Sequence, residues 1–385
     1  MAGERGIAYG FGRCSGVLVS PGDVATAAPT ALILGLTNLD LSVIRRLARH
    51  VTAVVVEQPM VPYAHEARAL WELPVPVLTG ISPIGEHLGR RIAVDFESAS
   101  IGPPAEPVTP SGIEELAGPH AEAEPRPVRI NAEVSDIHEA SAVAPMVDGW
   151  ALLKAEDLAR MSATERTQLW HIITATGLDA PPVRFFDTNP AAATAPHYTT
   201  VAEEPLAIHR RGTRILDSPS SDAAMQTLTA LLERAPVAVP IVVLPMVSVP
   251  AEVTDFLAMA GQRWRHGVTV ETPAAAIRAA EVTAGAHFIE VGTNDLSQYT
   301  MAWPRTIRND TLLPPDTLAA PVADLVHRIV TVARQNTTPC HVGLDLRPSK
   351  RLLDQLIGLG VTDISCPAPL VRHWRRLIDT APRHG

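Results

Sequence analysis

Residues 288–300 read FIEVGTNDLSQYT, and residues 267–276, shortly before them, read GVTVETPAAA. Each run opens with apolar residues typical of a buried strand and continues into polar residues where that strand would stop. Glu271 and Asp295 therefore follow the ends of neighbouring strands. Two carboxylates so placed commonly hold a hard divalent cation that keeps open water positions, which indicates Mg²⁺ and an anionic substrate. An ion pair with a nearby arginine is the alternative.

Beyond residue 127, short apolar segments recur with helical patterns between them. The strand candidates are residues 128–134, 149–154, 183–187, 240–246, 267–271, 288–292, 340–343 and 363–365. Eight strand–helix units in a region of roughly 250 residues indicate a TIM (β/α)8 barrel, whose chemistry takes place at the carboxyl ends of the strands. Polar residues at or near these predicted ends are Lys154, Arg184, Asp187, Glu271, Asn294, Asp295 and Cys340.

A smaller region precedes the barrel. Its apolar runs, at residues 16–19, 31–34, 53–56 and 75–78, alternate with helical stretches, which is typical of a small α/β domain. A stretch rich in proline, glutamate and alanine follows it and reads as a linker. We therefore expect an α/β chain with a small domain over residues 1–102, a linker over 103–127 and a barrel over 128–385.

The composition excludes several kinds of protein. Hydrophobic residues make up 46% of the chain and charged residues 19%, so we expect a packed core rather than a disordered chain. The net charge of −9 argues against a surface for nucleic acid or an anionic membrane. No leader and no long apolar run is found, and the three cysteines lack the spacing of metal ligands. We expect a soluble protein of the reducing cytoplasm.

The two opening runs closely resemble the phosphoenolpyruvate-binding barrel of the PEP-utilising enzymes. This family includes enzyme I of the bacterial sugar phosphotransferase system, pyruvate phosphate dikinase and phosphoenolpyruvate synthase. The resemblance implies that Glu271 and Asp295 bind Mg²⁺ and that Asn294 hydrogen-bonds the substrate phosphate. It also implies phosphoenolpyruvate as the substrate and pyruvate as the product.

The same resemblance implies that arginines neutralise the carboxylate and phosphate of the substrate, because the paired donors of a guanidinium group are suited to binding both. The counterparts are Arg184 on the third strand, Arg211 after it and Arg305 after the Asn-Asp motif. Arg210 is an alternative to Arg211 as the family's second arginine. The spacing from Pro205 favours Arg210, and the Arg-Gly-x-Arg motif favours Arg211.

Near the predicted strand ends, one residue is the counterpart of the family's acid and three positions depart from the family. Cys340 is the counterpart of the cysteine that protonates the enolate, and a thiol suits this role because its pKa can be tuned. The family's Gly-Glu after that cysteine is here His341-Val342. Lys154 replaces an arginine and so loses bidentate geometry. The family's lysine after the third strand is missing from the run TNPA at residues 188–191.

Residues 63–80, YAHEARALWELPVPVLTG, resemble the family's phosphohistidine segment, in which a histidine opens a helix that leads to a proline-started strand. Pro76 and Gly80 keep the expected spacing from His65, although Ala64 replaces a hydroxyl residue. The first region would then be a swivelling phosphohistidine domain, with the phosphoryl group accepted by His65 at a helix start. A surface histidine without function is the alternative.

The sequence leaves three functional hypotheses. The first is a Mg²⁺-dependent phosphotransferase that moves the phosphoryl group of phosphoenolpyruvate to His65, with an unknown protein or small molecule as the next acceptor. The second is an impaired enzyme that binds phosphoenolpyruvate or pyruvate as a regulator, because neither a carrier-docking insertion nor an ATP-grasp domain is recognisable. The third is a Mg²⁺-pyruvate aldolase or lyase. By analogy with the family, we also expect a homodimer formed through the barrel.

Overall fold

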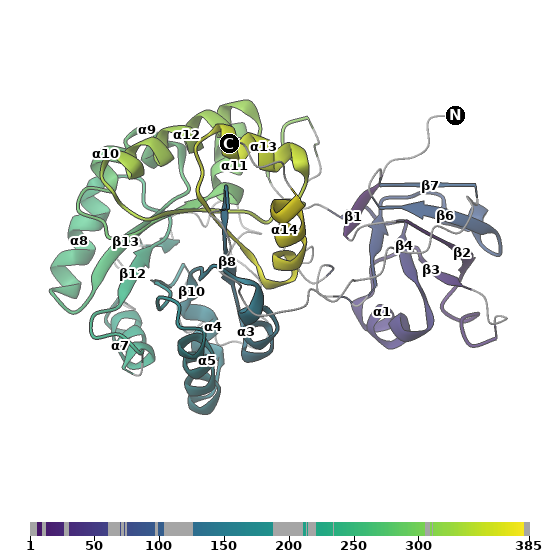
Figure 1. Ribbon diagram of the computed structural model, residues 1–385, viewed down its shortest axis with the longest axis horizontal. Coiled ribbons are helices and arrows are strands. Elements are labelled where there is room, and N and C mark those ends of the chain that lie inside the picture. Colours follow the sequence, from purple (N-terminus) through teal and green to yellow (C-terminus); the bar gives the residue numbers. More distant parts are fainter. Residues whose placement is uncertain are drawn as a thin grey trace. The chain divides into compact units, whose positions relative to one another are not determined.

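The computed structural model describes residues 6–9, 13–26, 31–60, 70, 73, 75–96, 99–103, 126–187, 211–212, 214, 221–233, 235–304, 309 and 311–380. The chain forms two compact units, and each combines a sheet with helices (Figure 1). The first unit contains the described residues up to 103, and the second contains those from 126 onward.

Within the described residues, the first unit is built on a seven-stranded sheet with the order β1-β5-β4-β3-β2-β6-β7. Strands β2 to β5 are parallel, while β1, β6 and β7 run antiparallel to their neighbours. The bounds are β1 Ile7–Tyr9, β2 Arg13–Val19, β3 Leu32–Leu36, β4 Ala53–Val56, β5 Val77–Thr79, β6 Arg91–Asp95 and β7 Ser100–Gly102. The small α/β domain expected from the sequence is therefore present.

Both faces of this sheet are buried, as expected because its central strands consist of consecutive apolar residues. Successive residues of a strand point to opposite faces. Leu34 and Val54 accordingly belong to one apolar cluster, and their neighbours Ile33 and Val55 belong to another. Helix α1 (Leu41–Leu47) packs on the first cluster through Ile44. Short 3₁₀ turns, η1 (Ala48–His50) and η2 (Ile84–His87), complete the described helices of this unit.

Two predictions for this part of the chain fall on residues that the structure does not describe. His65, the expected phosphoryl acceptor, lies outside the described residues. Most of the expected linker lies outside them as well. The acceptor role of His65 therefore stays a prediction.

The second unit contains a parallel sheet whose strand order is β10-β11-β12-β13-β14-β15-β16-β8-β9. Strands β9 and β10 are two parts of one extended stretch, interrupted at Ala151 and Leu152. Because β9 pairs with β8 and β10 pairs with β11, this stretch closes the sheet into an eight-stranded barrel. The strand bounds are β8 Arg129–Glu133, β9 Gly149–Trp150, β10 Leu153–Lys154, β11 Val183–Arg184, β12 Ile241–Leu244, β13 Arg265–Val270, β14 Ile289–Gly292, β15 Cys340–Gly343 and β16 Asp363–Pro367. The predicted TIM barrel is confirmed.

The helices of this unit follow the strands and form an outer layer around the barrel (Figure 1). Helix α12 shows why: its residues Val322, Val326, Ile329 and Ala333 are buried and recur at the spacing of one helical face. The helices are α3 Ile137–Val143, α4 Ala155–Arg160, α5 Ala163–Ala175, α7 Ser221–Leu232, α8 Pro250–Ala260, α9 Pro273–Ile277, α10 Ala279–Val282, α11 Thr293–Met301, α12 Ala320–Gln335, α13 Lys350–Gly358 and α14 Ala368–Thr380, with a 3₁₀ turn η3 at Ala144–Met146.

The barrel interior is identified by residues from alternate strands that meet each other. Leu152, Val243 and Phe288 form one apolar cluster although their strands are not adjacent, which places them in a layer inside the barrel. Because strand side chains alternate, Glu290 and Gly292 face the interior with Phe288. The interior of β14 therefore changes from apolar to acidic toward the carboxyl end of the strand.

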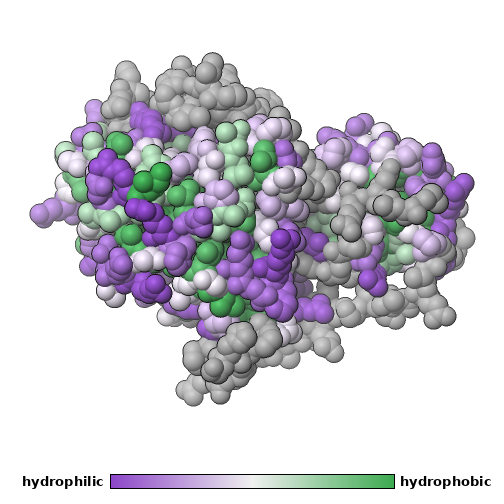
Figure 2. Space-filling view, turned by 90° about the horizontal axis from the view of Figure 1, so that it is seen from above, coloured by the Kyte–Doolittle hydropathy of each residue, from purple (hydrophilic) through white to green (hydrophobic). Residues whose placement is uncertain are grey.

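The polarity of the surface is mixed, as expected for a sequence whose mean hydropathy is only slightly positive, at +0.12. Figure 2 shows hydrophilic and hydrophobic side chains interspersed over one face. Among the described residues, no helix is both long and apolar enough to cross a membrane.

Candidate active site at the barrel mouth

The carboxyl ends of β13 and β14 bring Glu271 against Gly292. The register pairs Val270 with Val291, so Glu271 lies beside Gly292 at the barrel mouth. A Cβ built on Gly292 would lie 2.6 Å from Oε2 of Glu271 and 2.7 Å from its Cβ. A side chain at position 292 would therefore displace the carboxylate, which explains the glycine that begins the GTND run.

Helix α11 begins directly after β14, with Gly292 as its N-cap residue. Thr293, Asn294 and Asp295 form the first turn, and Asp295 is buried. A carboxylate in the first turn interacts favourably with the helix dipole. The absence of a loop between strand and helix fixes Asp295 at the mouth, close to Glu271.

Arg211 connects the acidic groups of the mouth. Its Nε and Nη2 donate to Asp187, with distances of 3.1 Å and 2.5 Å to Oδ2. Nη1 and Nη2 donate to the two oxygens of Asp295 at 3.0 Å and 3.2 Å. Burial lowers the pKa of this guanidinium, but Asp187 and Asp295 raise it by more, so Arg211 is charged. The ion pair considered as an alternative for Asp295 is thus present.

The glycine after Arg211 explains why this arginine reaches the mouth. Gly212 has a φ of +61°, and a Cβ built there would lie 2.3 Å from the carbonyl oxygen of Pro245. Only glycine tolerates both the conformation and the close approach. Of the two competing arginines, the structure brings Arg211 to the mouth, while Arg210 lies outside the described residues.

Glu271 is a buried carboxylate in a negatively charged environment. Burial, followed by the charges of Asp295 and Asp187, raises its pKa to about 7, although Arg211 and Arg184 lower it. Its Oε1 accepts a hydrogen bond of 2.7 Å from the backbone N–H of Met246. The group is therefore held in place but lacks enough positive charge to remain fully ionised.

Arg184 and Lys154 occupy the ends of β11 and β10 and are register partners. Arg184 Nη2 lies 3.4 Å from Glu156, and its Nε is buried without a partner among the described residues. Lys154 Nζ lies 2.6 Å from Glu133, which ends β8. Both cations therefore line the mouth, as predicted.

Asn294 and Arg305 complete the predicted substrate-binding set. The side-chain amide nitrogen of Asn294 donates to Asp345, and its Oδ1 is buried without a partner among the described residues. Asn294 is at the mouth, but its amide donor is engaged by a carboxylate. Arg305 lies outside the described residues, so its role stays a prediction.

The prediction for Cys340 as a residue of the mouth is wrong. Cys340 begins β15 and pairs with Ile289, the first residue of β14, whereas the mouth is formed by Gly343 paired with Gly292. Three residues of strand span about 10 Å, so the thiol lies near the opposite end of the barrel. Burial, with Glu290 and Asp363, also raises the pKa of the thiol.

Sequence reasoning missed Glu290. It is a charged residue inside the apolar run FIEVG, which was the available signal, and it is buried in the barrel interior. Ser365 donates a hydrogen bond to its Oε1. Burial, followed by the charges of Glu133 and Glu271, raises its pKa well above the ordinary value, against the lowering effects of Ser365 and Lys154.

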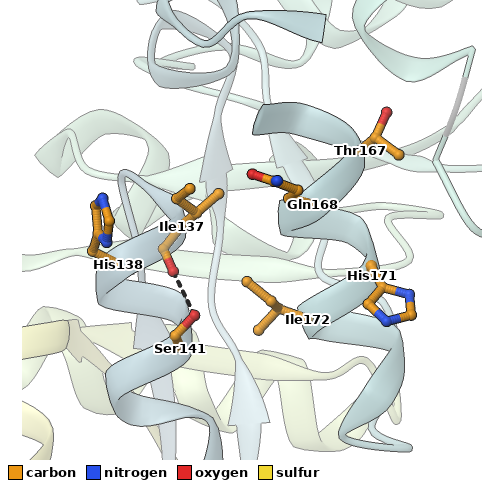
Figure 3. A pocket seen from close by; sticks show the side chains of 7 residues that line it. All are labelled: Ile137, His138, Ser141, Thr167, Gln168, His171 and Ile172. Atoms are coloured by element: carbon orange, nitrogen blue, oxygen red, sulfur yellow. Dashed lines mark hydrogen bonds between the residues drawn. The ribbon is translucent and has the colours of Figure 1, made fainter. Parts of the chain in front are cut away.

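A separate hollow of about 470 Å³ lies between α3 and α5, in the outer helix layer rather than at the mouth. Figure 3 shows that its two histidines, His138 on α3 and His171 on α5, point away from one another. The lining residues are Ile137, His138, Ser141, Thr167, Gln168, His171 and Ile172. These residues do not assemble an acid–base pair, so the barrel mouth is the stronger candidate.

The fold and the site together define an α/β-barrel protein whose mouth carries buried acidic and arginine side chains. The family model "PEP-utilising enzyme, PEP-binding domain" matches residues 128–382, and the chain belongs to this family of PEP-utilising enzymes.

Three curated relatives illustrate the range of the family. The phosphoenolpyruvate-protein phosphotransferase of Streptomyces coelicolor is 34% identical over 186 residues, which cover 46% of this chain and 33% of that protein. The enzyme of the same name from Chlamydia pneumoniae is 30% identical over 121 residues, or 31% of this chain and 20% of that protein. A probable phosphoenolpyruvate synthase of Archaeoglobus fulgidus is 28% identical over 149 residues, or 37% and 20%. The matched part is a third or less of each relative.

Proposed function

We propose that this chain is a Mg²⁺-dependent phosphotransferase that transfers the phosphoryl group of phosphoenolpyruvate to a histidine and releases pyruvate. The observation that carries the proposal is the charge balance at the mouth. Glu156, Asp187, Glu271 and Asp295 meet two guanidinium groups, those of Arg184 and Arg211. Four carboxylates and two guanidinium groups leave two negative charges when all are ionised; the neighbouring pair of Lys154 and Glu133 adds none, and Asp345 beside Asn294 adds one more. This excess of negative charge favours a divalent cation.

Glu271 and Asp295 would hold the Mg²⁺. The fit rests on the raised pKa of Glu271, because a buried carboxylate short of positive charge favours a bound cation. Mg²⁺ commonly uses one or two carboxylates together with water and substrate phosphate, so two ligands suffice. When bound, the ion would neutralise negative charge on the transferring phosphoryl group.

The remaining cations would orient the substrate. Arg184 has a buried Nε without a partner among the described residues, and this donor is available to a carboxylate or phosphate. Lys154 would add a second cation from the neighbouring strand. Arg211 is occupied on both sides by Asp187 and Asp295, so we assign it mainly to holding Asp295 in position. Catalysis would come chiefly from positioning and charge neutralisation.

His65 is the proposed acceptor. In the transfer, its ring nitrogen forms a bond to phosphorus while the bond between phosphorus and the enol oxygen breaks, which leaves the enolate of pyruvate. Spacing within residues 63–80 supports this role. A protein or small molecule would receive the phosphoryl group next, and a homodimer through the barrel is proposed with it.

A regulator that binds phosphoenolpyruvate or pyruvate without turnover is the second candidate. The position of Cys340 favours it, because the expected proton donor begins β15 instead of ending it at the mouth. Incubation with ³²P-labelled phosphoenolpyruvate and Mg²⁺ separates the two. A phosphotransferase acquires acid-labile label, which disappears in His65→Ala, whereas a regulator binds the ligand and acquires none.

A further inference from the structure

Two neighbouring strands of the barrel end in the same arrangement. Gly292, at the end of β14, leaves the space taken by the carboxylate of Glu271 from β13. Gly343, at the end of β15, leaves the space taken by Glu290 from β14, because a Cβ built on Gly343 would lie 2.8 Å from Oε1 of Glu290. Each missing side chain is thus replaced by a carboxylate from the preceding strand.

This arrangement lifts the carboxyl group of Glu290 to the mouth of the barrel. Its backbone lies two residues below Gly292, but its Oε1 is beside Gly343, which is the register partner of both Gly292 and Ser365. Ser365 donates a hydrogen bond to the same oxygen. The carboxyl group therefore belongs to the last layer of the barrel interior, and it forms part of the floor of the proposed substrate site.

The charged groups around Glu290 come from several strands and favour its protonated form. Burial is the largest cause that raises the pKa of Glu290, and the charges of Glu133 of β8 and Glu271 after β13 add to it; the hydrogen bond from Ser365 of β16, the second-largest cause, and Lys154 of β10 act in the opposite direction. Its second oxygen, Oε2, is buried and has no partner among the described residues. With Oε1 accepting from Ser365, a proton on Oε2 would have no acceptor among the described residues and would be available to a bound ligand.

We propose that Glu290 is the catalytic acid that protonates the enolate of pyruvate, the role that the sequence suggested for Cys340. This inference rests on the proposed function, which supplies the enolate. The electron pair of the C2–C3 double bond takes the proton from Oε2 and forms the new C3–H bond, while the C2–O bond becomes a carbonyl. Glu290 is left as a carboxylate and regains its proton from water. Carboxylic acids kept neutral by burial are suited to this kind of proton transfer.

Two other titratable groups of β15, His341 and Cys340, lie too deep for this role. His341 is the register partner of Glu290, but it packs edge-on against Phe288 with ring centroids 4.7 Å apart, one layer below the mouth. Burial lowers the pKa of His341 to about 4, in spite of the nearby Asp363. Cys340 lies lower still. Glu133 also ends its strand at the mouth, but it pairs with Lys154 at 2.6 Å. Glu290 reaches the last layer, is not a proposed metal ligand, and keeps one oxygen without a partner among the described residues.

The test uses the full chain with Mg²⁺ and compares Glu290→Gln with Cys340→Ala. Glutamine keeps the size of the protonated acid and can still accept from Ser365, and Glu290→Asp provides a second variant that keeps the acid but shortens its reach. One readout is the form of the product from phosphoenolpyruvate, measured as transient ultraviolet absorbance of free enolpyruvate. The other is exchange of pyruvate methyl protons with D₂O, followed by proton NMR, which needs no phosphoryl acceptor.

We expect the wild type and Cys340→Ala to form pyruvate without free enolpyruvate and to exchange methyl protons at similar rates. Glu290→Gln should release enolpyruvate and lose at least about tenfold in methyl exchange, the lower limit usual for a positioned acid–base group. The methyl exchange rate of Glu290→Asp should lie between those of the wild type and Glu290→Gln. Exchange that is unchanged in Glu290→Gln, or lost equally in Cys340→Ala, overturns the assignment of Glu290. If the wild-type protein exchanges methyl protons but acquires no ³²P, the proposed phosphotransferase activity is overturned. The role of Glu290 is then decided by the exchange rates of the variants alone.

Discussion

Replacing Glu271 with glutamine should change how the stability of the barrel depends on pH. The pKa of Glu271 is raised from 4.5 to about 7 by burial and by Asp295 and Asp187. A carboxyl group with a raised pKa binds its proton more tightly in the folded chain than in the unfolded chain. Its contribution to stability is therefore complete below about pH 4.5, decreases as the pH rises, and is lost above about pH 7.

The size of the effect follows from the shift. One pKa unit corresponds to about 1.4 kcal/mol, so between pH 5 and pH 8 this group alone should reduce the free energy of unfolding by about 2–3 kcal/mol. Glutamine cannot ionise, but it keeps the oxygen that accepts from Met246. The difference in stability between Glu271→Gln and the wild type should thus shift in favour of the variant by that amount on going from pH 5 to pH 8.

Urea unfolding in the presence of EDTA measures this difference. Tryptophan fluorescence reports on the barrel, because Trp150, Trp170, Trp264, Trp303 and Trp374 belong to it. Comparing the variant with the wild type at each pH removes the contribution of other titrating groups. An equal pH dependence in the two proteins would refute the inference that Glu271 is a carboxylate short of positive charge.

Two further substitutions test the geometry of the mouth. Arg211→Ala removes the ion pairs of this guanidinium with the buried Asp187 and Asp295, so it should destabilise the barrel by about 3–5 kcal/mol in denaturant unfolding and abolish binding of phosphoenolpyruvate in calorimetry. An unchanged midpoint would show that this arginine does not hold the two carboxylates. Gly292→Ala places a Cβ 2.6 Å from Oε2 of Glu271, so Mg²⁺-dependent ligand binding should fall at least about tenfold while Gly285→Ala, in a surface turn, leaves it unchanged. Equal binding in both glycine variants would contradict the tight contact.

The barrel itself was predictable because each strand is a short apolar run that ends on polar residues. The placement of Glu271, Asp295, Arg184 and Lys154 at the mouth followed from those ends. Contacts between the side chains did not follow from the sequence. The pairing of Asp295 with an arginine, rather than with a cation alone, depends on how the segment around Arg211 returns to the barrel.

The errors have a common physical origin in strand register. The carboxyl ends of the strands face the mouth in such a barrel, so Cys340, which begins the four-residue strand β15, was assigned to the wrong end. Register also determines which residues share the interior, and for that reason Glu290 was missed although it lies in the run that decides the fold. His65 and Arg305 are outside the described residues, so their roles remain predictions.

Mn²⁺ can replace Mg²⁺ as a paramagnetic probe, and its binding to the full chain can be followed by electron paramagnetic resonance with and without phosphoenolpyruvate. The control is Asp354→Ala, which removes an exposed carboxylate of α13 that pairs with Lys350. If Glu271 and Asp295 hold the cation, wild type and Asp354→Ala should bind one Mn²⁺ per chain more tightly when phosphoenolpyruvate is present, and Asp295→Ala should lose this binding. Equal Mn²⁺ binding by Asp295→Ala, with the same response to phosphoenolpyruvate, would contradict the placement of the metal and substrate at the barrel mouth.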